Sequence, residues 1–183
     1  MLIQTQPVTV EPVSLTVAKE LVRLDGEHLD DELERAISAA RSEAEQWAGR
    51  SFAPQQWMLI RDGWFGDALA LPYGPVDAID EITYLDEDGD WQTLPAAAYT
   101  LDTSIVFRAP GYKFPRLLGR DHSVKLRFDT GTWDNGVPDD ILRAIAMLAQ
   151  STFDSLSEQP ETLRERAWSL LRPYRFQSGL RAA

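Results

Sequence analysis

The residues best suited to chemistry form the acidic run Asp86-Glu87-Asp88-Gly89-Asp90. Closely spaced carboxylates are typical of calcium loops, which also need ligands at alternating positions, glycine at the sixth position and a distant bidentate glutamate. Here the glycine is fourth, and the run lies between two strand-like segments. We therefore predict an acidic hairpin turn, with no metal site.

Other candidate catalytic groups have structural explanations. Asp139 and Asp140 could form a general acid and base in a cleft, but two acids at the start of a helix also match its positive end. His28 and His122 lie in polar, loop-like stretches with no second histidine at metal-binding spacing. No glycine pattern matches a phosphate-binding loop. The sequence predicts no cofactor, and a small carboxylate hydrolase is the least favoured alternative.

Composition narrows the class of protein further. The 183 residues contain no cysteine, which excludes disulfides, thiolate metal sites and cysteine nucleophiles. The net charge of -11 opposes non-specific binding of nucleic acid by the whole surface. The start of the chain lacks a basic region followed by a long apolar core, so we expect no signal peptide. No run approaches the length of a membrane span, and we expect a soluble protein made in the cytoplasm.

Charge is distributed unevenly along the chain. Acidic residues dominate residues 14–49, whereas residues 160–183 hold five arginines against Glu161 and Glu165. Such asymmetry can orient a subunit against a neighbour or an acidic partner, but it is also compatible with an ordinary solvated surface.

Helix signals occur at both ends of the sequence. Residues 1–13 predict an extended arm, and Ser14 can cap a first helix. Asp30 or Asp31 is expected to cap a longer helix that ends at Gly49. Together these form a helix pair over residues 14–50, and the longer helix carries the apolar stripe Leu33, Ala36, Ile37, Ala40, Ala44 and Trp47.

The middle of the chain, residues 51–136, predicts short antiparallel strands. Strands are expected at Gln56–Arg61, Leu69–Leu71, Ile79–Leu85, Trp91–Leu94, Tyr99–Leu101, Ile105–Phe107 and around Val124, Leu126 and Phe128. Hydrophobic residues in the last segment alternate with charged ones, which predicts a strand with one buried face.

Two further helices are predicted after this segment. Pro138 suits the first turn of a helix over residues 137–154, which we expect to be the most buried. A polar break at Ser155–Pro160 precedes a last helix, Thr162–Leu171, ended by Pro173. The predicted fold is α+β: a helical body with a β-rich insertion, in one domain over residues 1–183 that ends in a helix and tail over 160–183.

The end of the last helix combines apolar, aromatic and arginine side chains. These residue types are favoured at interfaces, but the segment could equally fold back on its own core. The segment comprises Leu170, Leu171, Arg172, Pro173, Tyr174, Arg175 and Phe176.

Taken in order, these features resemble the head–tail connector (adaptor, or head-completion) proteins of tailed phages, a family also found in phage-like gene transfer particles. The resemblance covers residues 11–176. It is carried by Glu11-Pro12-Val13-Ser14-Leu15, Asp30-Asp31, Trp47-Ala48-Gly49-Arg50-Ser51-Phe52, Leu71-Pro72-Tyr73-Gly74-Pro75-Val76, Ile82-Thr83-Tyr84-Leu85-Asp86-Glu87-Asp88-Gly89, Phe128-Asp129-Thr130-Gly131-Thr132-Trp133, Val137-Pro138-Asp139-Asp140-Ile141 and Leu170-Leu171-Arg172-Pro173-Tyr174-Arg175.

The resemblance implies a structural protein of the virion neck, assembled in the host cytoplasm, and not an enzyme. Such proteins form rings, commonly of twelve subunits, beneath the portal protein; they extend the DNA channel and carry the tail or stopper protein. By resemblance, residues 170–176 would dock on the portal, and double-stranded DNA would pass without sequence-specific binding. Ring contacts are expected to include Asp30, Asp31, Glu34, Arg35 and Arg41. A tail-completion or baseplate module is the alternative.

Overall fold

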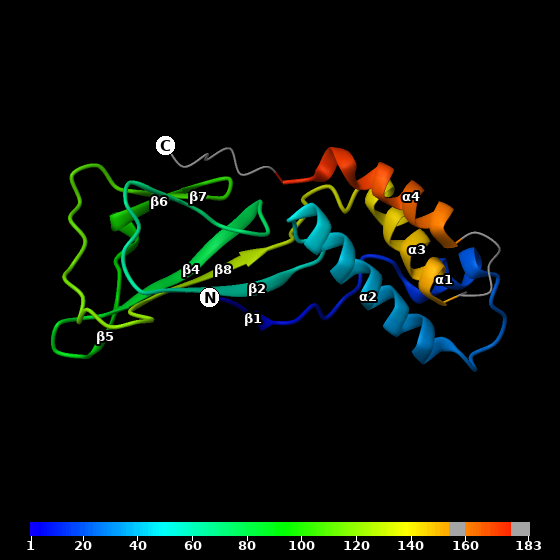
Figure 1. The fold of residues 1–183 in the computed structure, drawn as a ribbon, viewed down its shortest axis with the longest axis horizontal. Helices are drawn as coiled ribbons and strands as arrows, with labels where there is room; N and C mark the ends of the chain where they lie inside the picture. Colours follow the sequence, from blue (N-terminus) through cyan, green and yellow to red (C-terminus); the bar gives the residue numbers. More distant parts are fainter. Residues whose placement is uncertain (154–159, 177–183) are drawn as a thin grey trace. The chain divides into compact units, whose positions relative to one another are not determined.

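The computed structural model describes residues 1–153 and 160–176, which form an α+β fold as predicted. Tertiary contacts divide the chain into two compact units. The β unit contains residues 1–8 and 54–131, and the helical unit contains residues 9–53, 132–153 and 160–176 (Figure 1). The β unit closely matches the predicted insertion at 51–136 but also includes the start of the chain. Whether both units act as one connector domain stays a prediction.

The helical unit is built from four helices of the described chain. They are α1 (Leu15–Val22), α2 (Asp30–Ala48), α3 (Asp139–Phe153) and α4 (Pro160–Leu171), the last followed by a 3-10 turn at Arg172–Tyr174. Ser14 caps α1 as predicted, its Oγ accepting from the Val17 N–H at 3.4 Å. Gly49 ends α2 with a φ of 65°, a backbone conformation that glycine adopts at low cost.

The start of α2 differs from the prediction. The capping position is Leu29, whose side chain makes no capping hydrogen bond, so the expected cap by Asp30 or Asp31 is wrong. Asp30, Asp31 and Glu32 instead occupy the first turn, where negative charge favours the helix dipole. Asp30 also accepts from Lys19 of α1 at 2.6 Å, which joins the two helices.

The core of the helical unit lies among these helices. Ile141, Ile145 and Leu148 of α3 are fully buried, as are Leu33 and Ala44 in the predicted stripe of α2. Trp47, in contrast, is only partly buried. The predicted break at 155–160 lies almost entirely outside the described residues.

The β unit contains two antiparallel sheets. Its strands are β1 (Leu2–Gln6), β2 (Gln55–Arg61), β3 (Ala68–Ala70), β4 (Val76–Leu85), β5 (Trp91–Thr93), β6 (Tyr99–Asp102), β7 (Ile105–Arg108) and β8 (Val124–Thr130). The larger sheet has the order β1-β2-β8-β4-β5 and the smaller one the order β3-β7-β6. β8 is thus the central strand, paired with β2 and β4.

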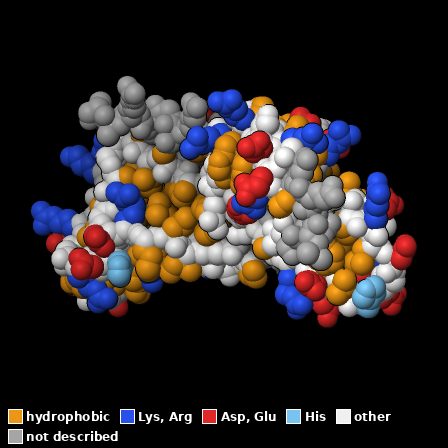
Figure 2. Space-filling model, turned by 45° about the vertical axis from the view of Figure 1, so that its right-hand side comes forward, with side chains coloured by type: hydrophobic (Ala, Val, Ile, Leu, Met, Phe, Trp, Pro, Cys, Tyr) orange, Lys and Arg blue, Asp and Glu red, His pale blue; other side chains and the backbone are white. Residues whose placement is uncertain are grey.

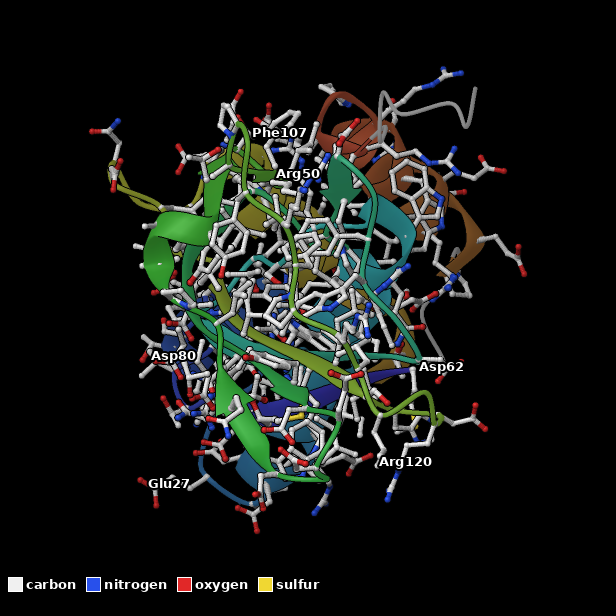
Figure 3. The ribbon with its side chains drawn as sticks, turned by 90° about the vertical axis from the view of Figure 1, so that its left-hand side faces the viewer. Glu27, Arg50, Asp62, Asp80, Phe107 and Arg120 are labelled. Carbon is white, nitrogen blue, oxygen red and sulfur yellow. The ribbon has the colours of Figure 1, made fainter. Side chains whose placement is uncertain are left out.

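The alternation predicted for β8 is confirmed. Val124, Leu126 and Phe128 are fully buried, whereas Lys125 and Arg127 are half-buried on the other face. The buried face joins the core of the β unit, which also includes Val106 of the smaller sheet. Not every large side chain is enclosed, since Phe107 remains 37% exposed (Figure 3).

The first residues form a strand, not only the expected extended arm. Met1 and Ile60 exchange two hydrogen bonds of 2.8 Å, and Leu2 pairs with Leu59. Reciprocal bonds of this kind define an antiparallel ladder, so β1 is an edge strand of the larger sheet.

A long connection between β7 and β8 is held by aromatic rings. Trp64 and Phe114 stack with ring centroids 4.4 Å apart, and the Trp64 indole N–H donates to the Pro115 carbonyl at 2.7 Å. Phe65 meets the same Phe114 ring edge-on at 5.0 Å. These contacts give an otherwise irregular segment a defined path. In the described part of the chain, no helix is both long and apolar enough to cross a membrane.

Candidate interaction surfaces

The acidic run forms the predicted hairpin turn between β4 and β5. The Asp86 carboxylate accepts from the backbone N–H groups of Asp90 at 2.9 Å and Asp88 at 3.1 Å, and from the Gln92 amide at 2.9 Å. The bond from Asp90, followed by that from Gln92, lowers the pKa of Asp86, because both stabilise its charged form. This carboxylate therefore serves the turn itself.

The other candidate catalytic residues are dispersed. Asp139 and Asp140 are exposed in the first turn of α3. His28 and His122 are exposed, and the His122 backbone N–H donates to Asp62 at 2.9 Å. Among the residues described, no three His, Asp or Glu side chains cluster in a way that could hold a metal ion.

The predicted docking segment, residues 170–176, returns to the end of α2. Leu171 is fully buried in the helical core. The Phe176 N–H donates to the Ala48 carbonyl at 2.6 Å. A side chain at Gly49 would meet the Phe176 Cβ at 3.7 Å, so glycine lets the two segments lie close together. Residues beyond Phe176 lie outside the described part.

Aromatic and arginine side chains line this return. Trp47 of α2 stacks on Trp168 of α4 with centroids 5.3 Å apart. The Arg175 guanidinium lies over the Trp47 ring at 5.4 Å, and Arg50 lies over the Phe176 ring at 5.9 Å. Cation–π contacts at such distances favour a fixed arrangement of the segment.

The seven residues of the segment thus divide into two groups. Leu171 is buried, and Leu170, Tyr174 and Phe176 are half-buried against the helical unit; Arg172, Pro173 and Arg175 are exposed. Folding back and presenting a surface are therefore compatible here, because apolar side chains face the core and two arginines face outward.

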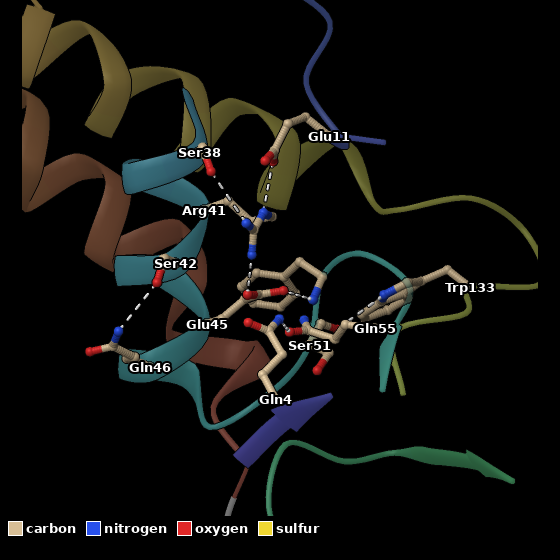
Figure 4. Close-up of polar contacts among 11 residues, drawn as sticks. Gln4, Glu11, Ser38, Arg41, Ser42, Glu45, Gln46, Ser51, Gln55 and Trp133 are labelled. Atoms are coloured by element: carbon tan, nitrogen blue, oxygen red, sulfur yellow. Dashed lines mark hydrogen bonds and ion pairs between the residues drawn. The ribbon is translucent and has the colours of Figure 1, made fainter. Parts of the chain in front are cut away.

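The predicted ring-contact residues are also divided. Asp31, Glu34 and Arg35 are exposed on α2, and Asp30 is half-buried in its pair with Lys19. Arg41, however, is 7% exposed and bound within its own chain. It donates to Glu11 at 2.7 Å and to Glu45 at 2.6 Å (Figure 4).

This Arg41 network fixes three parts of the helical unit. Glu11 precedes α1, Arg41 and Glu45 lie on α2, and Glu45 also accepts from the Phe52 N–H at 2.7 Å. Burial alone would lower the pKa of Arg41, but the Glu11 hydrogen bond and the Glu45 charge outweigh it and raise that pKa. The guanidinium is thus a structural cation, stabilised by two carboxylates.

Sequence reasoning missed this network and an adjoining groove. The spacing of Arg41 and Glu45, four residues apart on a helix, was a readable signal for a pair. Glu11 was not, because it lies thirty residues before Arg41. A groove of about 560 Å³ runs between the segment before α1 and α2, lined by Val10, Val13, Leu15, Glu34, Arg35 and Ile37 among others.

The charged side chains do not form one patch of a single sign on the face drawn in Figure 2. Acidic, basic and hydrophobic side chains are interspersed there. A continuous basic surface, the usual electrostatic footprint of a tight nucleic-acid-binding protein, is not seen on this face.

The solved structures similar to this fold come from gene transfer agent (GTA) particles. A chain from the virion of a native GTA particle matches with a TM-score of 0.80 at 20% identity. Chains from the neck of an empty particle computed with C6 symmetry and of a native particle computed with C12 symmetry match with TM-scores of 0.76 and 0.74, at 19% and 21% identity. Each match covers 100% of this chain and 98% of the other.

These comparisons establish the fold. No family model matches the sequence, and no curated protein matches it. The whole chain nevertheless has the fold of chains in the neck of a GTA particle, which confirms at the level of fold the resemblance to phage head–tail connectors.

Proposed function

We propose that this protein is a structural component of the neck of a phage-like particle. Its role there is that of a head–tail adaptor: a ring beneath the portal protein that extends the DNA channel and carries the tail or stopper protein. The observation that carries the proposal is the full-length match to neck chains, with 98% of each neighbour's length covered. A match over both units leaves no additional domain of those chains unaccounted for.

A ring of identical subunits fits the neighbours and the charge pattern. Two of the neighbouring necks were computed with sixfold or twelvefold symmetry. Head-to-tail contacts in a ring join two different faces of each subunit. Exposed Asp31, Glu34 and Arg35 on α2 remain candidates for such contacts, whereas Arg41 is engaged within its own subunit. We propose twelve copies.

The function needs no catalysis and no cofactor. A DNA conduit requires weak contact with its cargo, and the net charge of -11 limits attraction to phosphates. We propose that double-stranded DNA passes without sequence-specific binding, and that the protein acts in the virion after assembly in the host cytoplasm.

The docking of residues 170–176 on the portal is narrowed by their exposure. Arg172 and Arg175 present two positive charges beside the exposed Pro173. Deleting the segment would remove Leu171 from the core, so charge reversal is the sharper test. We expect R172E/R175E to lower the affinity for a purified portal ring at least tenfold, measured by interferometry, with an unchanged melting temperature.

A matched control is the double substitution R143E/R166E. Both arginines are exposed on the helical unit, and the change in net charge is the same. Equal losses for the two variants would show that total charge governs binding and would contradict docking through the segment. A wild-type protein whose mass, measured by light scattering, does not rise to a ring-sized complex with portal would contradict the adaptor role.

A further inference from the structure

The larger sheet of the β unit ends in two open edges. β1 forms one edge and β5 the other. Because Met1 and Ile60 form a reciprocally bonded pair, the backbone groups of Leu2 and Gln4 point away from β2. Within the described residues, no further strand lies beyond either edge. An edge of this kind can accept a strand from another molecule.

The two edges coincide with two charge-free stretches of sequence. Residues 1–10 and 91–101 contain no Asp, Glu, Lys or Arg, although 26% of the chain is charged. Most residues in both stretches are exposed, including Ile3 at 41% and Trp91 at 45%. Comparable charge-free stretches at 51–60 and 144–153 are largely buried or half-buried, which explains their composition.

An exposed edge without charge needs a different explanation. Solitary edge strands are commonly protected from pairing by charged side chains. Two copies of a chain with a net charge of -11 repel each other, so contact is least unfavourable where neither copy carries charge. The composition of these edges is therefore that of surfaces covered by another copy.

The topology sets the direction of such a contact. All four neighbouring pairs in the five-stranded sheet are antiparallel, so β1 and β5 run in the same direction. Copies related by rotation around a ring keep their orientation relative to the ring axis. Such a relation would place β5 of one copy beside β1 of the next in parallel.

We propose that β1 of one copy pairs with β5 of a second copy, so that the five-stranded sheets continue from subunit to subunit. This inference rests on the proposed ring and names one of its contacts. The contact is head-to-tail, because it uses opposite edges of the sheet, and it can therefore close a ring.

Charges near the two edges are complementary in this arrangement. The acidic turn at 86–90 immediately precedes β5, and Arg61 ends β2 at the same end of the sheet, beside the start of β1. Parallel pairing brings the acidic turn of one copy toward Arg61 of the next. Asp62, which follows, is held by the His122 N–H at 2.9 Å.

Cross-linking tests the contact directly, since the chain has no native cysteine. Ile3 lies on the sheet face that carries Met58 and Arg127, and Thr93 lies on the same face beside Thr83. We expect I3C/T93C, treated with a short bis-maleimide, to give a ladder of covalent dimers, trimers and higher oligomers. Such a reagent tolerates a register shift of one side-chain row, about 7 Å.

The matched control is I3C/T100C, because Thr100 is exposed on β6 of the smaller sheet. Each variant is treated with and without added portal ring, and the mass of the untreated protein is measured by light scattering. A ladder for I3C/T93C with none for the control supports the proposal. Cross-linked dimers from I3C alone would indicate a twofold β1–β1 contact and overturn it.

Failure of this inference and failure of the proposed function give different results. Oligomers in light scattering without a ladder would overturn edge pairing and leave the ring standing. A protein that stays monomeric with and without portal, and forms no ladder, would contradict both the ring and its edge contact.

Discussion

Asp86 shows how a residue that looks like a metal ligand is used by its own turn. Its carboxylate accepts from Asp90, Gln92 and Asp88, and these bonds hold its pKa below the ordinary value. A group whose folded pKa is lowered stabilises the fold above its unfolded pKa and loses that contribution as pH falls through the folded value.

We expect the Asp86 carboxyl to titrate below the ordinary aspartate value of about 3.9, as measured by NMR. Gln92→Ala removes one donor and should raise the midpoint toward that value. Thr93→Ala, on the same strand, serves as the control and should leave the midpoint in place. A midpoint at the ordinary value in the wild-type protein would contradict the hydrogen-bonded turn.

Glu45 is 4% exposed and holds both the Arg41 guanidinium and the Phe52 amide. We expect Glu45→Ala to lower the free energy of unfolding by about 3–5 kcal/mol, because a buried cation and a buried N–H lose their partner. Urea denaturation measures this change. The double substitution R41M/E45L should be less destabilised than Glu45→Ala, since it removes the charge as well as its partner.

The Arg41 network also marks where sequence reasoning stops at the scale of single residues. On a helix, Arg41 is one of several charged side chains, and we expected it to contact a neighbouring subunit. Its burial depends on Glu11, which only the folded chain brings to it. Periodicity assigns a residue to a face of its helix, but it does not show what covers that face.

Among the elements, α3 is the clearest success of sequence reasoning. Its apolar residues cover more than one face, and Ile141, Ile145 and Leu148 are fully buried. We expect Ile145→Asp to destabilise the helical unit by several kcal/mol, because it places a charge in an apolar core. Arg143→Asp, an exposed position on the same helix, should have a small effect on the melting temperature. Equal melting temperatures for the two variants would mean that α3 is misplaced.

Strand β1 is the clearest failure at this scale. Its residues, Leu2–Gln6, include three uncharged polar side chains and no strict hydrophobic alternation. Its partner β2 lies more than fifty residues later, with Leu2 opposite Leu59. β8, in contrast, alternates strictly because one face of a central strand lies in the core. Local pattern therefore identified the centre of the sheet better than its edge.

At the scale of the whole molecule, order along the chain was more informative than any motif. The predicted β-rich insertion at 51–136 agrees closely with residues 54–131 of the β unit. The sequence could not assign residues 1–8 to the same unit, because that assignment depends on long-range pairing. Nor could it decide how residues 170–176 divide between core and surface, since both roles use the same residue types.

The position of β8 in the middle of its sheet has a consequence for synthesis on the ribosome. β8 is the last strand of the β unit to be translated, yet both β2 and β4 pair with it. The helical unit must likewise wait for α3 and α4, long after α1 and α2 have emerged. A nascent chain that ends before Val124 therefore has neither hydrophobic core complete, and contacts of high sequence separation make folding slow. Both units must reach their final structure late, within a short interval at the end of translation.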